Sequence, residues 1–132
     1  MQQLEEVRKS FETSPFFYHL GFEITHFQEG DVRLKLPVTR QLLNANQILH
    51  GGVHASMIDF VLGMVIRSTT RTRCITMNLN VNYFAPADSG SLFAQGRILQ
   101  QGYRTVTAEG EILEEQGEML AKGTGTFKLI RE

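Results

Sequence analysis

Two adjacent glycines stand directly before the longest apolar segment of this chain, and they could take part in catalysis through their backbone. If a helix begins at Gly51 and Gly52, their N–H groups have no intrahelical partner and lie at the positive end of the helix dipole. Such N–H groups can bind an oxyanion that develops during a reaction. The same spacing also fits glycines that only permit a tight entry into the helix, and the spacing alone does not decide between these readings.

Asp59 is the second residue with a chemical interpretation. It is flanked by Ile58, Phe60 and Val61, in a segment that we expect to be buried. A buried carboxylate is costly unless it is paired or used in chemistry, so Asp59 is a candidate general base. The alternative is a structural aspartate bonded to a backbone group or to Ser56.

The spacing of Gly51 and Asp59 has a geometric consequence. Eight residues of helix separate them by about 12 Å along the axis. An oxyanion donor and an attacking group must each lie within about 3 Å of one scissile carbonyl. We therefore expect a site shared between subunits, in which two antiparallel copies of the helix bring Gly51 of one beside Asp59 of the other.

The elements that must position these residues can be read from the apolar pattern. The helix is expected over Val53–Ser68, and its apolar residues occupy nearly every side, which is typical of a buried helix. A short helical lead-in is expected over Gln2–Phe11, followed by an apolar cluster at 16–20 that packs on the domain. Strands are expected at Phe22–Phe27, Val32–Leu36, Ile75–Tyr83, Leu92–Leu99, Thr105–Leu113 and Glu118–Leu129.

This order is two strands, one buried helix and then a meander of four strands, which predicts an α+β fold with one antiparallel sheet around one helix. Small residues inside the late strands, among them Gly110 and Gly123, would let the helix approach the sheet closely. In Ile75–Tyr83 a strict alternation is expected. It places the apolar residues Ile75, Met77, Leu79, Val81 and Tyr83 on one face and Thr76, Asn78, Asn80 and Asn82 on the other.

Length and composition restrict the remaining possibilities. A chain of 132 residues forms one domain, here residues 1–132 with 1–19 as the helical lead-in. A formal net charge of −1 argues against a nucleic-acid partner. Cys74 is the only cysteine, so no intrachain disulfide can form. The polar N-terminus does not resemble a signal peptide, and the stretch 53–66 is too short and too polar to span a membrane. We expect a soluble, cytoplasmic protein.

The triplet His50-Gly51-Gly52 followed by Asp59 and preceded by Asn44 resembles the motif of PaaI-type hotdog thioesterases. The resemblance extends from about Leu20 to Phe127 and includes the segment 78–87 and the turn 102–104. It implies a hotdog fold, in which an antiparallel sheet of five to six strands wraps around one long central helix. It also implies hydrolysis of acyl-coenzyme A (acyl-CoA) thioesters, with no cofactor apart from the coenzyme A (CoA) of the substrate.

By this resemblance, Asp59 is the general base or nucleophile and the Gly51 N–H of the partner subunit polarises the thioester carbonyl. His50 orients the acyl end or the glycine loop, Asn44 helps to place the attacking water, and Thr76 matches a Ser or Thr at the start of the long strand. The resemblance further implies a homodimer, and a homotetramer built as a dimer of dimers whose sheets join edge to edge.

Other residues are candidates for binding the substrate. Gly52, Ser56, Met57, Asn80 and Tyr83 are expected at the acyl end. Arginine offers a fork of N–H groups that matches phosphate, so Arg71, Arg73 and Arg104, with Arg67 as a further candidate, are expected to include one or two contacts to the CoA phosphates.

Competing interpretations can be weighed on the same residues. His50, His54 and Asp59 lack the glutamate that follows the first histidine of a zincin motif, so we expect no metal. Ser56 lacks a nucleophile-elbow context, and Cys74 has no recognisable partner. A hotdog protein that binds acyl-CoA without cleaving it is the main alternative, and a hotdog dehydratase is another. Release of a free thiol from an acyl-CoA distinguishes hydrolysis from both.

Overall fold

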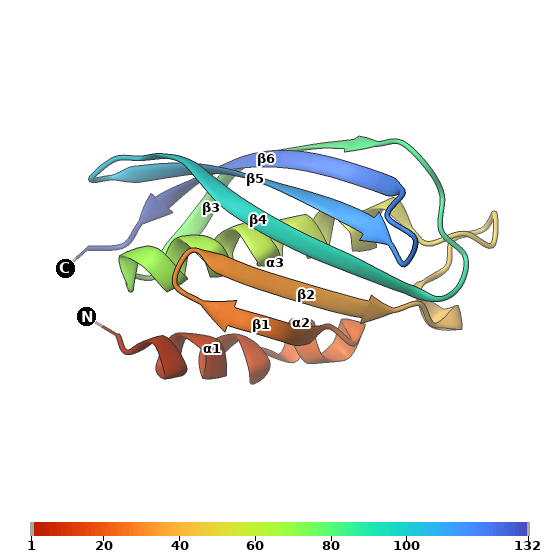
Figure 1. Cartoon of the computed structure of the whole chain (residues 1–132), viewed down its shortest axis with the longest axis horizontal. Helices are drawn as coiled ribbons and strands as arrows, with labels where there is room; N and C mark the ends of the chain where they lie inside the picture. The colour runs from red at the N-terminus through yellow and green to blue at the C-terminus, as the bar shows by residue number, and fades with distance from the viewer. Residues whose placement is uncertain (1, 132) are drawn as a thin grey trace.

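A computed structural model describes residues 2–131 as one sheet of six strands with a long helix lying against it (Figure 1). The helices and strands are α1 (Leu4–Glu12), α2 (Pro15–Leu20), β1 (Glu23–Gln28), β2 (Asp31–Pro37), α3 (Gly51–Thr70), β3 (Cys74–Tyr83), β4 (Ser91–Gln101), β5 (Thr105–Glu114) and β6 (Met119–Leu129). A single 3-10 turn, Arg40–Leu42, precedes α3. The predicted hotdog architecture is confirmed, and the predicted strands agree with the observed ones to within a few residues at their ends.

The order of strands in the sheet is β1-β2-β4-β5-β6-β3, with every neighbouring pair antiparallel. The prediction of a four-stranded meander is therefore wrong, because β3 pairs with β6 at the far edge instead of with β4. The segment 84–90 that joins β3 to β4 is longer than a tight hairpin, so it can carry the chain around the end of the sheet. This crossing leaves β3 at an edge of the described sheet.

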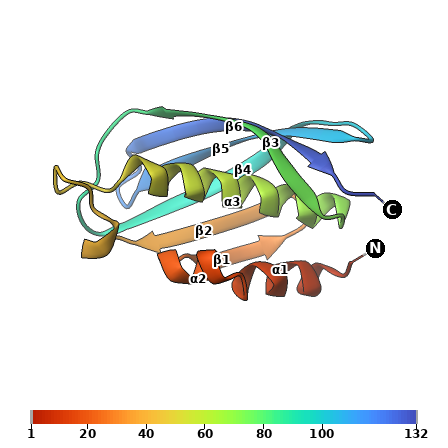
Figure 2. The same ribbon diagram turned by 180° about the vertical axis from the view of Figure 1, so that it is seen from behind.

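Helix α3 is buried against the concave face of the sheet, as Figures 1 and 2 show from opposite sides. It begins at Gly51 and ends at Thr70, two residues beyond the predicted helix at each end. Ile58 and Leu62 are fully buried. A Cβ added at Gly123 would lie 2.9 Å from Ile58 Cγ2, and one at Gly110 would lie 3.1 Å from Leu62 Cδ2. The expected close approach of the helix to glycines of the sheet is therefore observed.

The N-terminal residues form two short helices beside β1 and α3 (Figure 2). Pro15 occupies the first turn of α2, a position where its missing N–H costs nothing. Of the apolar cluster expected to pack on the domain, Phe17 is buried and contacts the ring of Phe60, whereas Phe16 and Tyr18 are exposed. No helix among residues 2–131 has both the length and the apolar character of a membrane span.

Strand β3 departs from the strict alternation expected for it. The pairing of β3 with β6 shifts between Thr76 and Asn78, which marks a β-bulge at Met77. The bulge reverses which side chains face the helix, so Ile75 and Met77 are exposed (57% and 60%) while Leu79 and Val81 pack against the core. Thr76 now shares the helix-facing side with Leu79 and Val81. The predicted grouping of Ile75 and Met77 with those residues is wrong for this reason.

Candidate active site

The first turn of α3 presents the backbone N–H of Gly51 without a partner among residues 2–131. His50 is the N-cap, and its Nδ1 accepts a hydrogen bond of 2.8 Å from the Gly52 N–H. The Val53 N–H donates to the His50 carbonyl. The Gly51 N–H has no hydrogen-bond partner among the described residues, so it is the group of this turn that remains available to an anion. Gly52, which was expected to bind substrate through its N–H, instead uses that group in the cap.

Tyr83 lies over this turn and fixes its other side. Its hydroxyl donates to the Gly51 carbonyl at 3.0 Å, and its ring comes within 3.5 Å of the position of a Cβ at Gly51. A cavity of about 380 Å³ lies beside both residues, lined among others by Asn44, Ile48, His54 and Phe84. The cavity therefore adjoins the free Gly51 N–H. Ile48 and Phe84 were not singled out from the sequence, because only the folded loop brings them to Gly51.

His54 is almost completely buried in the wall of this cavity. It is 3% exposed, its ring packs edge-on against Tyr83 at 5.7 Å, and its Nδ1 has no hydrogen-bond partner among residues 2–131. Burial lowers the pKa of this imidazole below its usual value, since the charged form loses solvation. His54 is therefore a neutral component of the cavity wall at neutral pH.

Asn44 organises the loop that precedes α3. Its side-chain carbonyl accepts hydrogen bonds from the backbone N–H of Asn46 at 2.8 Å and from that of Ile48 at 3.4 Å. The backbone N–H of Asn44 donates to the Ile48 carbonyl. The side-chain oxygen is thus used to close the loop. The side chain also lines the cavity beside Gly51, which leaves the amide NH₂ as the group that could act on a ligand.

Asp59 on α3 and Thr76 on β3 form a hydrogen-bonded pair. The Thr76 hydroxyl donates to Asp59 Oδ1 at 2.7 Å, a short bond of the kind made to a carboxylate. The bulge at Met77 makes this possible by turning Thr76 toward α3. Asp59 is half-buried, so the expectation of a fully buried carboxylate is wrong: the edge position of β3 leaves one side of Asp59 uncovered.

The alternative in which Asp59 bonds to Ser56 is not observed. Ser56 donates its hydroxyl to the Gly52 carbonyl at 2.8 Å, one turn earlier in α3. Met57, expected at the acyl end, is fully buried in the protomer's core. Asn80 lies beyond the bulge, on the face away from α3, and its amide donates to Asn78. The structure thus brings Thr76 to Asp59 and Tyr83 to Gly51.

The four candidate arginines have different surroundings. Arg67 donates to Gln2 and lies over the Phe11 ring at 5.0 Å, so it ties α1 to α3; burial lowers its pKa. Arg71 and Arg73 line a cavity at the C-terminal end of α3. Arg104 is exposed on the β4–β5 turn, and its carbonyl accepts the Leu129 N–H.

Cys74 begins β3 and is half-buried. Burial raises the pKa of its thiol to about 11, and the nearby Arg67 charge offsets only part of that increase. A thiol that stays protonated is a poor nucleophile, in agreement with the expectation of an inert cysteine. Within the described part of the chain, no three His, Cys, Asp or Glu side chains gather closely enough to hold a metal ion.

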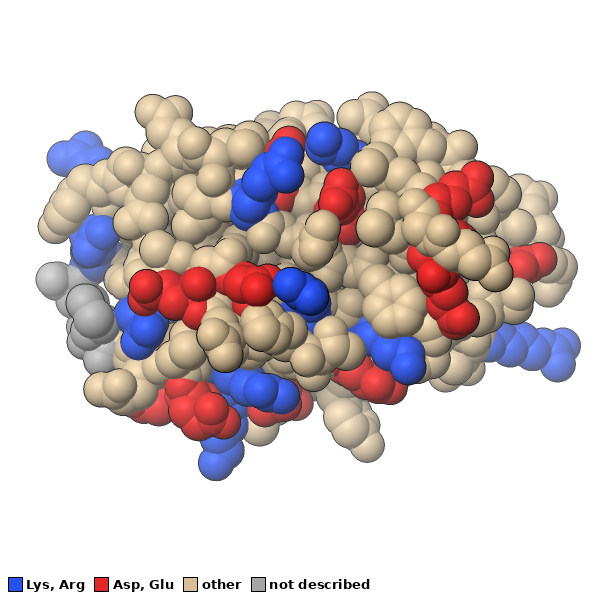
Figure 3. Space-filling view, in the orientation of Figure 1, with Lys and Arg blue, Asp and Glu red and all other residues tan. Residues whose placement is uncertain are grey.

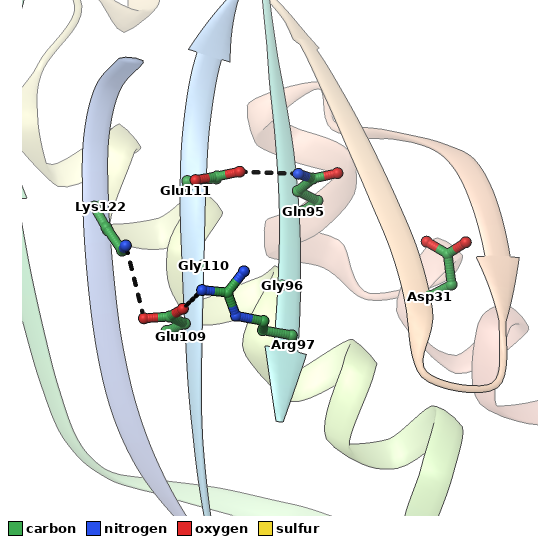
Figure 4. A pocket seen from close by; sticks show the side chains of 8 residues that line it. All are labelled: Asp31, Gln95, Gly96, Arg97, Glu109, Gly110, Glu111 and Lys122. Atoms are coloured by element: carbon green, nitrogen blue, oxygen red, sulfur yellow. Dashed lines mark hydrogen bonds and ion pairs between the residues drawn. The ribbon is translucent and has the colours of Figure 1, made fainter. Parts of the chain in front are cut away.

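The outer face of the sheet has a shallow cavity of about 140 Å³ between β4, β5 and β6 (Figure 4). Its charged groups are paired across strands: Glu109 contacts Arg97 and Lys122, and Gln95 donates to Glu111. Acidic and basic side chains are mixed over this face (Figure 3). Because its charges are already paired with one another, we assign no chemistry to this cavity.

Comparison with known proteins adds a family to this geometry. The model of the thioesterase superfamily matches residues 46–121, more than half of the chain. A medium/long-chain acyl-CoA thioesterase, YigI of Salmonella typhimurium, is 27% identical over 86% of this chain and 84% of its own length.

Two solved structures have the same fold. The PaaI protein of the Escherichia coli phenylacetic acid degradation operon has a TM-score of 0.88 at 24% identity, covering 98% of this chain and 97% of its own. A Streptococcus mutans protein bound to acetyl-CoA has a TM-score of 0.80 at 25% identity, covering 85% and 90%.

Proposed function

Since this chain belongs to the thioesterase superfamily, we propose that it hydrolyses acyl-CoA thioesters to a free acid and CoA. The observation that carries the proposal is the hydrogen bond from Thr76 to Asp59, which orients a half-buried carboxylate on the same helix whose first N–H is free. The acyl-CoA substrate is supported by the acyl-CoA thioesterase relative and by the acetyl-CoA-bound structural neighbour.

In this proposal the thioester carbonyl oxygen accepts the Gly51 N–H. As the carbonyl carbon becomes tetrahedral, its negative charge is stabilised by that N–H and by the positive end of α3. The His50 cap and the Tyr83 hydroxyl keep the Gly51 peptide in place. Donors that are already oriented lose no energy to reorganisation when charge develops.

Asp59 supplies the other half of the reaction. It either removes a proton from an attacking water or attacks the carbonyl carbon itself, and the Thr76 hydroxyl holds one of its oxygens while the other remains available. Asn44 is proposed to help position the water with its amide NH₂. The tetrahedral intermediate collapses with loss of the CoA thiolate, which leaves readily, so no strong general acid is needed. Where Asp59 is the nucleophile, the product of this collapse is a mixed anhydride with Asp59, and water then hydrolyses it to release the free acid.

The two halves require two subunits. Gly51 and Asp59 lie on one uninterrupted helix, about 12 Å apart along its axis, so one carbonyl cannot reach both within a protomer. We propose a homodimer in which Gly51 of one protomer faces Asp59 of its partner. The exposed edge strand β3, with Ile75 and Met77 uncovered, supports edge-to-edge joining of the two sheets, because exposed edges with apolar residues favour pairing with another strand. A tetramer built from two such dimers follows from the resemblance.

Thiol release from a panel of acyl-CoA esters, followed with a colorimetric reagent, tests this function. We expect turnover by the wild-type protein and a loss of most of it in Asp59→Asn, which keeps the shape of the side chain and removes its charge. Asp31→Asn makes the same chemical change at the half-buried first residue of β2, outside the candidate site, and should leave turnover unchanged. Near-normal turnover by Asp59→Asn would contradict the mechanism. Tight binding of acyl-CoA without thiol release would instead identify a non-catalytic binding protein.

A further inference from the structure

A buried imidazole without a partner lies in the wall of the cavity beside Gly51. His54 is 3% exposed, and its Nδ1 has no hydrogen-bond partner among residues 2–131. Buried polar atoms of folded proteins are nearly always hydrogen-bonded, so an exception calls for an explanation. Because His54 lines a cavity of about 380 Å³, a ligand that enters this cavity can supply a bond that the protein does not.

The other polar groups around this cavity already have a role. The Tyr83 hydroxyl donates to the Gly51 carbonyl, and the side-chain carbonyl of Asn44 accepts two N–H groups of its own loop. In the proposed reaction the Gly51 N–H binds the thioester carbonyl and the Asn44 NH₂ positions the attacking water. The rest of the wall is apolar and consists of Ile48, Leu49, Phe84, Ala85 and Pro86. The His54 imidazole is therefore the polar group that is left to contact the acyl group.

His54 lies one turn of α3 beyond Gly51, at the end of the molecule away from both termini (Figure 2). Three residues of helix correspond to a rise of about 4.5 Å, and residues i and i+3 are neighbours on one face. Helical side chains lean toward the N-terminus of their helix. The His54 ring accordingly packs edge-on against Tyr83, whose hydroxyl bonds to the Gly51 carbonyl. The imidazole is thus close to the position proposed for the thioester carbonyl.

The chemistry of this imidazole favours a neutral polar group. Burial lowers the pKa of His54, and a neutral imidazole has one N–H donor and one acceptor nitrogen. Each edge of the ring carries one of these nitrogens, so the edge that faces the cavity presents one in either orientation. A hydroxyl matches both, because it donates and accepts. The residues that line the cavity carry no charge when His54 is neutral, so a charged acyl group would meet no opposite charge there.

We infer that His54 selects acyl groups with a hydroxyl on the third carbon, through a hydrogen bond to that hydroxyl. The inference rests on the proposed function, which places the thioester carbonyl at Gly51. Four bonds separate the carbonyl oxygen from an oxygen on the third carbon, a span of up to about 5 Å. This span matches the rise from Gly51 to His54, whereas an oxygen on the second carbon reaches only about 3.5 Å. An unsubstituted chain would leave the imidazole unpaired, and sites that hydrogen-bond a substrate hydroxyl discriminate against analogues that lack it.

The test measures thiol release from hexanoyl-CoA and, separately, from each enantiomer of 3-hydroxyhexanoyl-CoA. We expect the wild type to use one 3-hydroxy ester at least about 10-fold better than the unsubstituted ester in kcat/KM. His54→Leu removes both nitrogens and should bring the ratio of the two kcat/KM values close to one. His54→Gln keeps a donor and an acceptor and should retain part of the preference. His19→Leu makes the same change on an exposed residue of α2 and should keep the wild-type ratio.

Two results would overturn the inference. One is equal use of the unsubstituted and 3-hydroxy esters by the wild type, which needs no variant to fold. The other is a preference that persists in a folded His54→Leu protein, with folding checked by thermal unfolding.

Calorimetric binding of the same esters in an Asp59→Asn background separates this inference from the proposed function. If the wild type hydrolyses no ester, the thioesterase proposal fails. Tighter binding of a 3-hydroxy ester that is lost on adding His54→Leu would still support selection by His54. Equal affinity for the unsubstituted and 3-hydroxy esters would count against it.

Discussion

Replacing Gly51 with proline would test the oxyanion role of a single backbone N–H. Gly51 is the first residue of α3, where proline is well tolerated, and its N–H makes no bond that proline would remove. His50 has φ −60° and ψ 136°, the extended conformation that a residue before proline prefers. A Cβ at Gly51 would meet Tyr83 at 3.5 Å, an ordinary contact. We therefore expect Gly51→Pro to fold with a melting temperature close to that of the wild type.

The effect on catalysis should be large. Removing one donor to an oxyanion typically costs about 3–4 kcal/mol of transition-state stabilisation, or about 100- to 1000-fold in kcat. The next two N–H groups of the turn cannot replace it, because the Gly52 N–H is bound to His50 Nδ1 and the Val53 N–H to the His50 carbonyl. The loss should fall on kcat more than on KM, since the charge develops only in the transition state.

Gly51→Ala is the matched control, because it adds the same Cβ and retains the N–H. The assay is thiol release with kcat and KM determined for wild type, Gly51→Ala and Gly51→Pro, beside thermal unfolding of all three. We expect Gly51→Ala to keep most of the activity and Gly51→Pro to lose it without unfolding. Equal activity of the proline and alanine variants would refute the assignment of the Gly51 N–H as the oxyanion donor.

Three further predictions concern Thr76, His54 and Cys74. Thr76→Val removes the hydroxyl that holds Asp59 and should lower kcat about 10- to 100-fold with KM unchanged. Thr76→Ser keeps the hydroxyl and should stay near wild type. Equal kcat in both variants would contradict this role. Burial lowers the pKa of His54 in the folded state below its usual value of 6.5, so at acidic pH the unfolded chain binds a proton that the folded chain does not. As the pH is lowered from 6.5, the free energy of unfolding should therefore decrease by up to about 1.4 kcal/mol per pH unit. Urea unfolding should show a weaker decrease in His54→Phe, and identical slopes would argue against a buried neutral imidazole. Burial raises the pKa of Cys74 to about 11, so a disulfide reagent at pH 8 should label it slowly in the folded protein and rapidly in urea; fast labelling of the folded protein would contradict this.

The sequence predicted the elements of this fold better than their arrangement. The apolar residues located α3, where they occupy nearly every side, and the six strands, because burial dictates the apolar pattern within each element. They did not predict that β3 would leave β4 and pair with β6, since strand order depends on contacts between segments far apart in the chain. The predicted helical lead-in over 1–19 was not divided into two helices, whereas the structure has α1 and α2 there and Pro15 starts the second.

Within the candidate site, the sequence indicated residue types but not their hydrogen-bond partners. Gly51 and Gly52 are equivalent as sequence letters, and only the cap by His50 distinguishes the free N–H from the bound one. Met57 could not be separated from a substrate-lining residue, because burial in the core and lining of a pocket both select apolar side chains. His54 has no local signal, since the cavity beside Gly51 exists only where α3 meets the loop before it and the end of β3.

The bulge at Met77 connects these failures of sequence reasoning with the chemistry of the site. Regular alternation from Tyr83 back along β3 would turn Thr76 away from α3, and Asp59 would then lack the hydroxyl that orients it. One extra residue in the strand reverses the faces and brings Thr76 to within 2.7 Å of the carboxylate. The same reversal exposes Ile75 and Met77 on an edge strand, where they favour pairing with a second copy. A single local irregularity thus serves both requirements of a shared site: it orients the carboxylate within one protomer, and it exposes the edge against which a partner could supply the Gly51 N–H.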